Sequence, residues 1–98
     1  MKTTFLFRDV ARVEFKEATA WHEGRQSGLG AEFVEEVEEV FDKILRQPDR
    51  YPIKHADVRE ALVSRFPYAV YYRLRQNRIV IVAVIHCSRD PNVWQARQ

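Results

Sequence analysis

The sequence has little of what marks several large protein classes. It contains one cysteine, which excludes an internal disulfide framework and a zinc site built from cysteines. Three glycines and four prolines in 98 residues are too few for a low-complexity chain. The longest apolar run, residues 79–85, is far shorter than the roughly 20 residues of a membrane-spanning helix. Arg8 and Asp9 interrupt the apolar stretch near the N-terminus, unlike in a secretory signal. We therefore expect a soluble, cytoplasmic protein.

What is present is a globular composition with an uneven charge distribution. Hydrophobic residues make up 46% of the chain and charged residues 31%, which predicts one folded domain over residues 1–98. The first 50 residues carry 8 Lys and Arg against 11 Asp and Glu, whereas residues 51–98 carry 8 against 3. A basic face of this kind attracts phosphate or an acidic partner, although ordinary solvated charge explains the count equally well.

Two helices are predicted in the first half of the chain, after a strand over residues 3–8. Asp9 is a suitable N-cap for a helix over residues 10–25, and Gly28 and Gly30 favour a turn before the next helix. The second helix has apolar residues at spacings of three and four until Pro48 ends it, whereas its acidic residues mostly occupy the other face. Its apolar residues are Leu29, Phe33, Val37, Val40, Phe41, Ile44 and Leu45.

Three strands are predicted in the second half, over residues 58–65, 68–75 and 78–86. Gln76 and Asn77 form a two-residue connection, and the last strand is apolar on both faces, as in the centre of a sheet. The tail after Cys87 is expected to be irregular or one short turn. These elements predict an α+β fold in which an N-terminal strand precedes a two-helix hairpin packed on a mostly antiparallel sheet, with a C-terminal three-strand meander. The opposite sheet face, with Tyr71, Arg73 and Arg75, is expected to be open to a ligand.

The chain has no phosphate-binding glycine loop and no histidine pair with metal-ligand spacing, so we expect no metal and no cofactor. One basic and aromatic constellation remains. Arginines hold phosphates, aromatic rings stack on unpaired bases, and a histidine moves protons near neutral pH. A histidine at the end of an apolar strand, such as His86, is more often a structural residue, and a tryptophan such as Trp94 more often closes the open end of a small core. The constellation comprises Arg59, Arg65, Tyr68, Tyr71, Arg73, His86, Arg89 and Trp94.

Several short motifs run from the first helix to the tail at consistent spacing. They are Glu17-Ala18-X-X-Trp21-His22-Glu23, Gly28-Leu29-Gly30 with Phe33, Pro48-X-X-Tyr51-Pro52, Arg59, Arg65-Phe66-Pro67-Tyr68 with Tyr71 and Tyr72, and His86-X-X-Arg89-Asp90-Pro91-X-X-Trp94-X-X-Arg97. Each motif is short, but their ordered set resembles the ParE branch of the RelE/ParE toxin superfamily.

The resemblance implies a toxin of a type II toxin–antitoxin system that is neutralised by a cognate, ParD-like antitoxin in a hetero-oligomer. ParE-like members are associated with inhibition of DNA gyrase, and RelE-like members with ribosome-dependent cleavage of mRNA. RelE-like nucleases carry a basic residue after the tyrosine that opens the middle strand of the meander, and lysines on the strand before it. Here Ala69 follows Tyr68, and residues 61–63 contain no lysine, which favours the ParE-like function. A non-toxic remnant or binding module of the same fold is the third hypothesis.

These expectations assign roles to named residues. Under the nuclease alternative, His86 and Arg89 are catalytic. The antitoxin is expected to contact Leu29, Phe33 and Val37, or the edge of the meander. The residues predicted to bind the target are Arg59, Arg65, Tyr71, Arg73, Arg89, Trp94 and Arg97.

Overall fold

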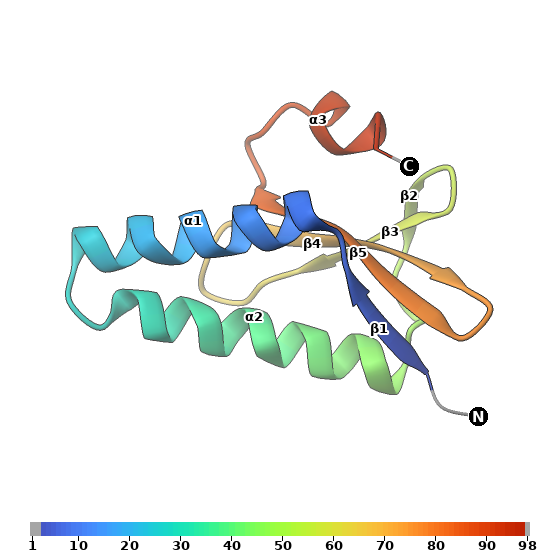
Figure 1. The fold of residues 1–98 in the computed structure, drawn as a ribbon, viewed down its shortest axis with the longest axis horizontal. Helices are drawn as coiled ribbons and strands as arrows, with labels where there is room; N and C mark the ends of the chain where they lie inside the picture. The colour runs from blue at the N-terminus through green and yellow to red at the C-terminus, as the bar shows by residue number, and fades with distance from the viewer. Residues whose placement is uncertain (1–2, 98) are drawn as a thin grey trace.

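The computed structural model describes residues 3–97 and contains eight helices and strands in that part of the chain (Figure 1). The prediction of an α+β fold with a helix hairpin on a mostly antiparallel sheet is confirmed. In chain order the elements are β1 (Thr4–Phe7), α1 (Asp9–Arg25), α2 (Leu29–Arg46), β2 (Ile53–His55), β3 (Val58–Leu62), β4 (Tyr68–Arg75), β5 (Arg78–His86) and α3 (Asn92–Gln95).

The strands form one sheet in the order β1-β5-β4-β3-β2. β1 pairs in parallel with β5, and the other neighbours are antiparallel, so β3, β4 and β5 make the predicted meander. Gln76 and Asn77 connect β4 to β5 with φ angles of 46° and 64°, the left-handed conformation that a tight hairpin turn requires. β2 was not predicted, because its three residues are all exposed and carry no alternating pattern.

β3 ends three residues earlier than predicted. Arg65 has a φ angle of 70°, which breaks the extended conformation before the chain enters β4. Its guanidinium forms ion pairs with Glu32 at 2.6 Å and with Glu36 at 3.1 Å, so the loop is tied to α2 instead of extending the sheet.

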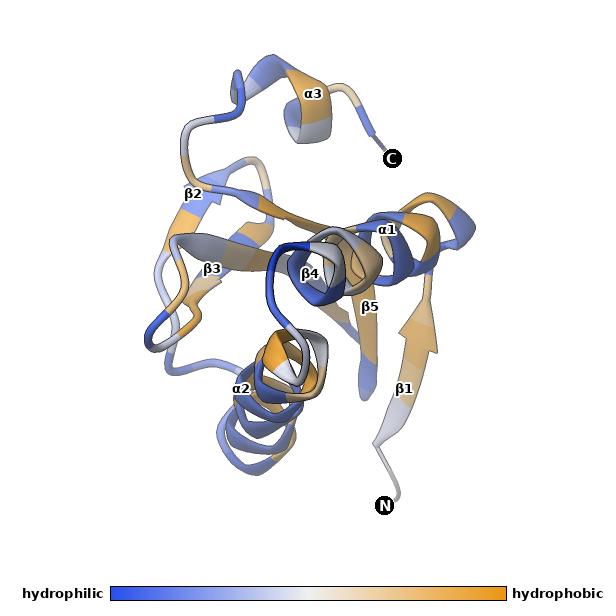
Figure 2. Cartoon of the chain, turned by 90° about the vertical axis from the view of Figure 1, so that its left-hand side faces the viewer, coloured by the Kyte–Doolittle hydropathy of each residue, from blue (hydrophilic) through white to orange (hydrophobic). Residues whose placement is uncertain are grey.

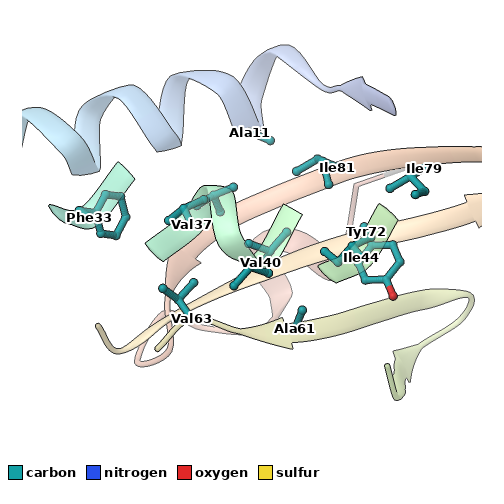
Figure 3. Packing of buried hydrophobic residues seen from close by; sticks show 12 residues of the cluster. Ala11, Phe33, Val37, Val40, Ile44, Ala61, Val63, Tyr72, Ile79 and Ile81 are labelled. Carbon is teal, nitrogen blue, oxygen red and sulfur yellow. The ribbon is translucent and has the colours of Figure 1, made fainter. Parts of the chain in front are cut away.

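α1 and α2 form the predicted hairpin, and α2 supplies most of its buried surface. Phe33, Val37, Val40 and Ile44 of α2 are almost fully buried against the sheet (Figure 3). On α1 only Ala11 and His22 are buried. Three apolar residues of α1 are instead exposed to solvent: Val10, Val13 and Trp21 are 43%, 51% and 56% exposed.

A bulge in β5 determines which residues face each side of the sheet. Tyr71 pairs with Ala83 whereas Tyr72 pairs with Ile81, so Val82 is an extra residue on β5. The extra residue reverses the alternation of side chains along the strand. As a result Ile81 lies in the core beneath the hairpin, and Ala83 lies in a smaller cluster on the opposite face.

That opposite face is covered by the C-terminal tail. Figures 1 and 2 show α3 and α2 on opposite sides of the strands. Trp94 of α3 is 4% exposed and packs in the cluster with Tyr71, Ala83 and Ile85. The expectation that this face is open to a ligand is therefore wrong: Tyr71 and Arg73 are only 7% and 8% exposed.

Candidate functional site

Tyr71 and Trp94, both predicted to bind a target, contact each other. Their rings stack with centroids 4.0 Å apart, and the Tyr71 hydroxyl donates a hydrogen bond to Glu60 Oε2 at 2.8 Å. Burial of the phenol, and next the adjacent Glu60 carboxylate, raise the pKa of Tyr71. Both side chains therefore hold the tail against the sheet.

The two arginines of the same region hold the tail as well. Arg73 forms an ion pair with Asp57 at 3.1 Å and donates a hydrogen bond to the carbonyl oxygen of Arg97 at 3.1 Å. The Arg97 guanidinium donates to both carboxylate oxygens of Glu14 on α1, at 3.0 and 2.7 Å. These contacts connect a strand, the tail and the first helix, so the two arginines have structural partners.

Arg59 and Arg65 also have partners within the chain. Arg59 donates hydrogen bonds from Nη1 to the carbonyl oxygens of Asp49 and Tyr51, at 3.0 and 2.7 Å, and so fixes the segment that follows α2. Arg65 is held by the two ion pairs to α2 described above. Six of the seven predicted target-binding residues thus have structural contacts within the chain. Four of them lie on strands or the loop between them, and Trp94 and Arg97 lie in the tail.

Arg89 differs from the other predicted target-binding residues. Its side chain is exposed and, within residues 3–97, forms no ion pair or side-chain hydrogen bond. It lines a hollow of about 260 Å³ that adjoins a second hollow of about 530 Å³. Trp21, Tyr68 and His86 line both, so we treat the two as one site, the strand-end hollow, formed where α1, the start of β4 and the end of β5 meet.

Four rings succeed one another along the strand-end hollow. The centroids of Trp21 and His22 are 4.9 Å apart, those of His22 and Tyr68 5.4 Å, and those of Tyr68 and His86 5.3 Å. His22 is buried and stacks on Phe33 at 4.6 Å, so it forms the floor. The Tyr68 hydroxyl is a hydrogen-bond donor at neutral pH, as in any tyrosine, and burial raises its pKa further.

His86 presents one defined nitrogen as a donor. Its Nδ1 accepts a hydrogen bond from the backbone amide of Ser88 at 3.0 Å and lies 2.8 Å from the Ser88 hydroxyl. An accepting Nδ1 carries no proton, so the neutral ring carries its proton on Nε2. The strand-end hollow therefore combines ring faces, a hydroxyl donor, an imidazole donor and one free guanidinium.

The sequence analysis named His86 and Arg89 but did not assign Trp21 or His22 to a site. Trp21 fitted the apolar side of α1 as well as any core residue, and only the direction of α1 relative to β4 exposes it. Tyr68 belonged to the basic and aromatic constellation, but the sequence carried no signal that joined it to Trp21 across 47 positions of chain.

A second depression, which we call the hairpin groove, lies between the two helices. Its volume is about 560 Å³, and its lining is almost wholly apolar, with Lys16 at its rim. The residues that line it are Phe15, Lys16, Thr19, Ala20, Glu23, Gly30, Ala31 and Val34. The two α2 side chains in this lining that could contact a bound molecule are Ala31 and Val34.

The residues predicted to contact an antitoxin do not line the hairpin groove. Phe33 and Val37 are fully buried in the core, so a partner cannot reach them in this structure, and only Leu29 is partly exposed. Phe33 and Val37 belong to the stripe of α2 that faces the sheet, so the prediction that they contact a partner is wrong for these two residues.

A family model described as the ParE toxin of the type II toxin–antitoxin system, parDE, matches residues 6–91. The chain belongs to the ParE toxin family. A solved structure of the chromosomal ParDE toxin–antitoxin system from P. aeruginosa has the same fold as the toxin described here. The TM-score is 0.71 at 16% sequence identity, over 86% of this chain and 95% of that chain. None of the curated proteins compared with the chain matches it.

The match to the ParE toxin family includes the strand-end hollow but not the end of the tail. His86 and Arg89 fall within residues 6–91, whereas Trp94 and Arg97 lie beyond them. Over residues 3–97 of this ParE-family toxin, no three His, Cys, Asp or Glu side chains are grouped as metal ligands. None of the helices in that range has the length and apolar character needed to cross a lipid bilayer.

Proposed function

We propose that this ParE-family protein is a cytoplasmic toxin that inhibits DNA gyrase and is silenced by a ParD-like antitoxin. Membership of the ParE toxin family supports the toxin role. The observation that carries the choice of surface is the free guanidinium of Arg89 beside the exposed ring of Trp21 in the strand-end hollow. Exposed aromatic and arginine side chains are the residue types that dominate binding energy at protein interfaces.

The hairpin groove is the proposed seat of the antitoxin. An amphipathic helix buries its apolar side chains in a groove of this kind, and small residues such as Ala20 and Ala31 let its backbone approach closely. Lys16, which forms no ion pair within the described part of the chain, is placed to meet an acidic residue of the partner. In this proposal the antitoxin contacts Ala31 and Val34 of α2, in place of the buried Phe33 and Val37 of the same helix.

A supercoiling assay with purified gyrase tests the target. We expect the toxin to inhibit supercoiling, Arg89→Ala and Trp21→Leu to weaken inhibition, and Arg46→Ala to leave it unchanged. Arg46 is a suitable control because it is an exposed arginine at the end of α2, outside the strand-end hollow. No inhibition of gyrase, together with mRNA cleavage in translating ribosomes, would instead support the nuclease alternative. Expression that causes no growth arrest would support a non-toxic remnant.

Binding of the antitoxin encoded beside the toxin gene tests the hairpin groove. Ala31→Arg fills the groove with a charged side chain and is expected to weaken antitoxin binding. Ala96→Arg adds the same side chain at an exposed position of the tail and is expected to have no effect. Equal binding by both variants, with both folded by circular dichroism, would place the antitoxin elsewhere.

A further inference from the structure

The strand-end hollow has the chemistry of a small-ligand site. We propose that it binds an unpaired nucleotide, with the base against the rings of Trp21 and Tyr68 and the phosphate at Arg89. The proposal rests on the proposed function, because it names a ligand for the surface that was assigned to the target. It is tested on the toxin alone, so that nucleotide binding and gyrase inhibition can fail separately.

The exposed ring of Trp21 is the first support. Large aromatic side chains are usually buried, yet Trp21 is 56% exposed within the hollow. Its ring is nevertheless held in place by the guanidinium of Arg25, 5.1 Å from the ring centroid, and by the edge contact with His22. Because the guanidinium of Arg25 lies over one face of the ring, the opposite face is the platform on which a base would stack, a contact worth about 1–3 kcal/mol in single-strand binding proteins.

The charges around the hollow are the second support. Glu14 lines it, but its carboxylate is already paired with Arg97 at 2.7 Å. Arg89 lines the same part of the hollow and forms no ion pair within residues 3–97. Glu17 is the other acid that lines this part, and it forms no ion pair in that range either. The larger part of the hollow has no acidic lining residue. For a phosphate alone, attraction by Arg89 is opposed by repulsion from the carboxylate of Glu17. A nucleotide adds the stacking energy of its base to the same attraction.

The polar donors and the size of the hollow fit the same ligand. The Tyr68 hydroxyl and His86 Nε2 are donors that face acceptors such as ring nitrogens and phosphate oxygens. The larger part, of about 530 Å³, lies in the size range of roughly 300–1,000 Å³ that small-molecule sites occupy, and the part beside Arg89 adds about 260 Å³. Since a base must leave its stack to enter, the ligand is an unpaired nucleotide and not an intact duplex.

Tryptophan fluorescence gives a direct test. The chain has two tryptophans, so a Trp94→Phe background, which keeps a ring on Tyr71, leaves Trp21 as the reporter. We expect adenosine monophosphate to quench this fluorescence saturably, adenosine to bind more weakly, and inorganic phosphate alone not to saturate. The absence of saturable quenching by adenosine monophosphate and by a short oligodeoxyadenylate, both raised to about 5 mM, would overturn the proposal.

Calorimetry on variants separates the two halves of the ligand. Arg89→Ala is expected to weaken the binding of adenosine monophosphate roughly tenfold, as for a lost charged hydrogen bond, and to leave adenosine binding unchanged. Trp21→Leu should weaken both ligands, and Arg46→Ala neither. An equal loss of adenosine and its monophosphate in Arg89→Ala, or any loss in Arg46→Ala, would refute this assignment of the phosphate.

Two comparisons complete the test. If the oligonucleotide binds roughly tenfold more tightly than the mononucleotide, the natural ligand is single-stranded nucleic acid. If the two bind equally, the natural ligand is a free nucleotide. Both results support the site. Gyrase inhibition without nucleotide binding refutes the nucleotide proposal alone, whereas nucleotide binding without gyrase inhibition refutes only the proposed target.

Discussion

The indole of Trp94 lies flat on the phenol of Tyr71, with the planes of the two rings 17° apart and their centroids at 4.0 Å. This stack attaches α3, a helix of four residues, to the face of the sheet that the hairpin leaves free. A helix this short has almost no stability of its own, so its position depends on what its one buried side chain contacts.

Replacement of Trp94 tests that dependence. Trp94→Ala removes the ring that covers Tyr71 and Ile85, and we expect it to lower the free energy of unfolding by about 3–5 kcal/mol. Trp94→Phe keeps a ring in place and should cost less. Urea denaturation followed by circular dichroism measures both. A Trp94→Ala variant as stable as the parent chain would mean that the tail is not part of the folded core.

The strands of the meander could be predicted closely from the sequence because local patterns determine them. β4 and β5 have the predicted bounds, since the turn at Gln76 and Asn77 and the apolar run after it are local signals. β2 could not be predicted, because pairing with β3 alone makes its three exposed residues a strand. The bulge at Val82 depends on register across β4, which no single strand encodes.

The candidate site was predicted less well than the fold. Residue type alone does not distinguish an arginine that binds a partner from one that holds the chain together. Arg73 and Arg97 have contacts within the fold, whereas Arg89 forms no ion pair with any of residues 3–97. The difference depends on acids far away in sequence, such as Glu14, which lies 83 positions before Arg97. Trp21 was missed for the same reason, since its exposure follows from how α1 crosses the sheet.

The ion pair between Glu14 and Arg97 is expected to stabilise the tail. Both side chains are mostly buried, with 13% and 19% exposure, and Glu14 also accepts a hydrogen bond from the backbone amide of Val84. Each single alanine substitution should lower the free energy of unfolding by about 1–3 kcal/mol, and a double-mutant cycle should give a coupling of about 0.5–3 kcal/mol.

The pair between Asp9 and Arg12 is the matched control for this cycle. It is also formed by a carboxylate and a guanidinium, but its side chains are 98% and 58% exposed. Exposed pairs contribute less than about 1 kcal/mol, so we expect a coupling near zero. A Glu14–Arg97 coupling no larger than that of this control would show that this ion pair does not stabilise the tail.

Two glycines at opposite ends of the same turn should respond differently to alanine. A Cβ atom at Gly30 would lie 2.9 Å from the carbonyl oxygen of Thr19, a backbone atom of the facing helix, whereas a Cβ at Gly24 meets nothing within 4 Å. Gly30→Ala is therefore expected to destabilise the fold by about 1–3 kcal/mol through overpacking. Gly24→Ala should stabilise it by roughly 0.5–1 kcal/mol, because alanine favours the helix. Thermal melts of the two variants check this; a shift of both in the same direction would contradict the close approach of α1 and α2 at Gly30.

The carboxylate of Glu23 gives the hairpin a measurable pH dependence. It accepts hydrogen bonds from the backbone amides of Gly28, at 3.0 and 3.1 Å, and of Gly30 at 2.9 Å, and these bonds lower the pKa of Glu23 below its ordinary value of 4.5. A carboxyl whose pKa is lower in the folded than in the unfolded state contributes stability above the unfolded pKa, and loses it as the pH falls through the folded pKa.

The stability difference between the parent chain and Glu23→Gln should thus be constant near neutral pH and shrink below about pH 4.5. Urea midpoints of both proteins, measured from about pH 7 to about pH 3, test this. The pKa of Asp57, which its hydrogen bond with Arg75 lowers, affects both proteins alike and cancels in the difference. Parallel curves over the whole range would mean that the Glu23 charge does not stabilise the start of α2.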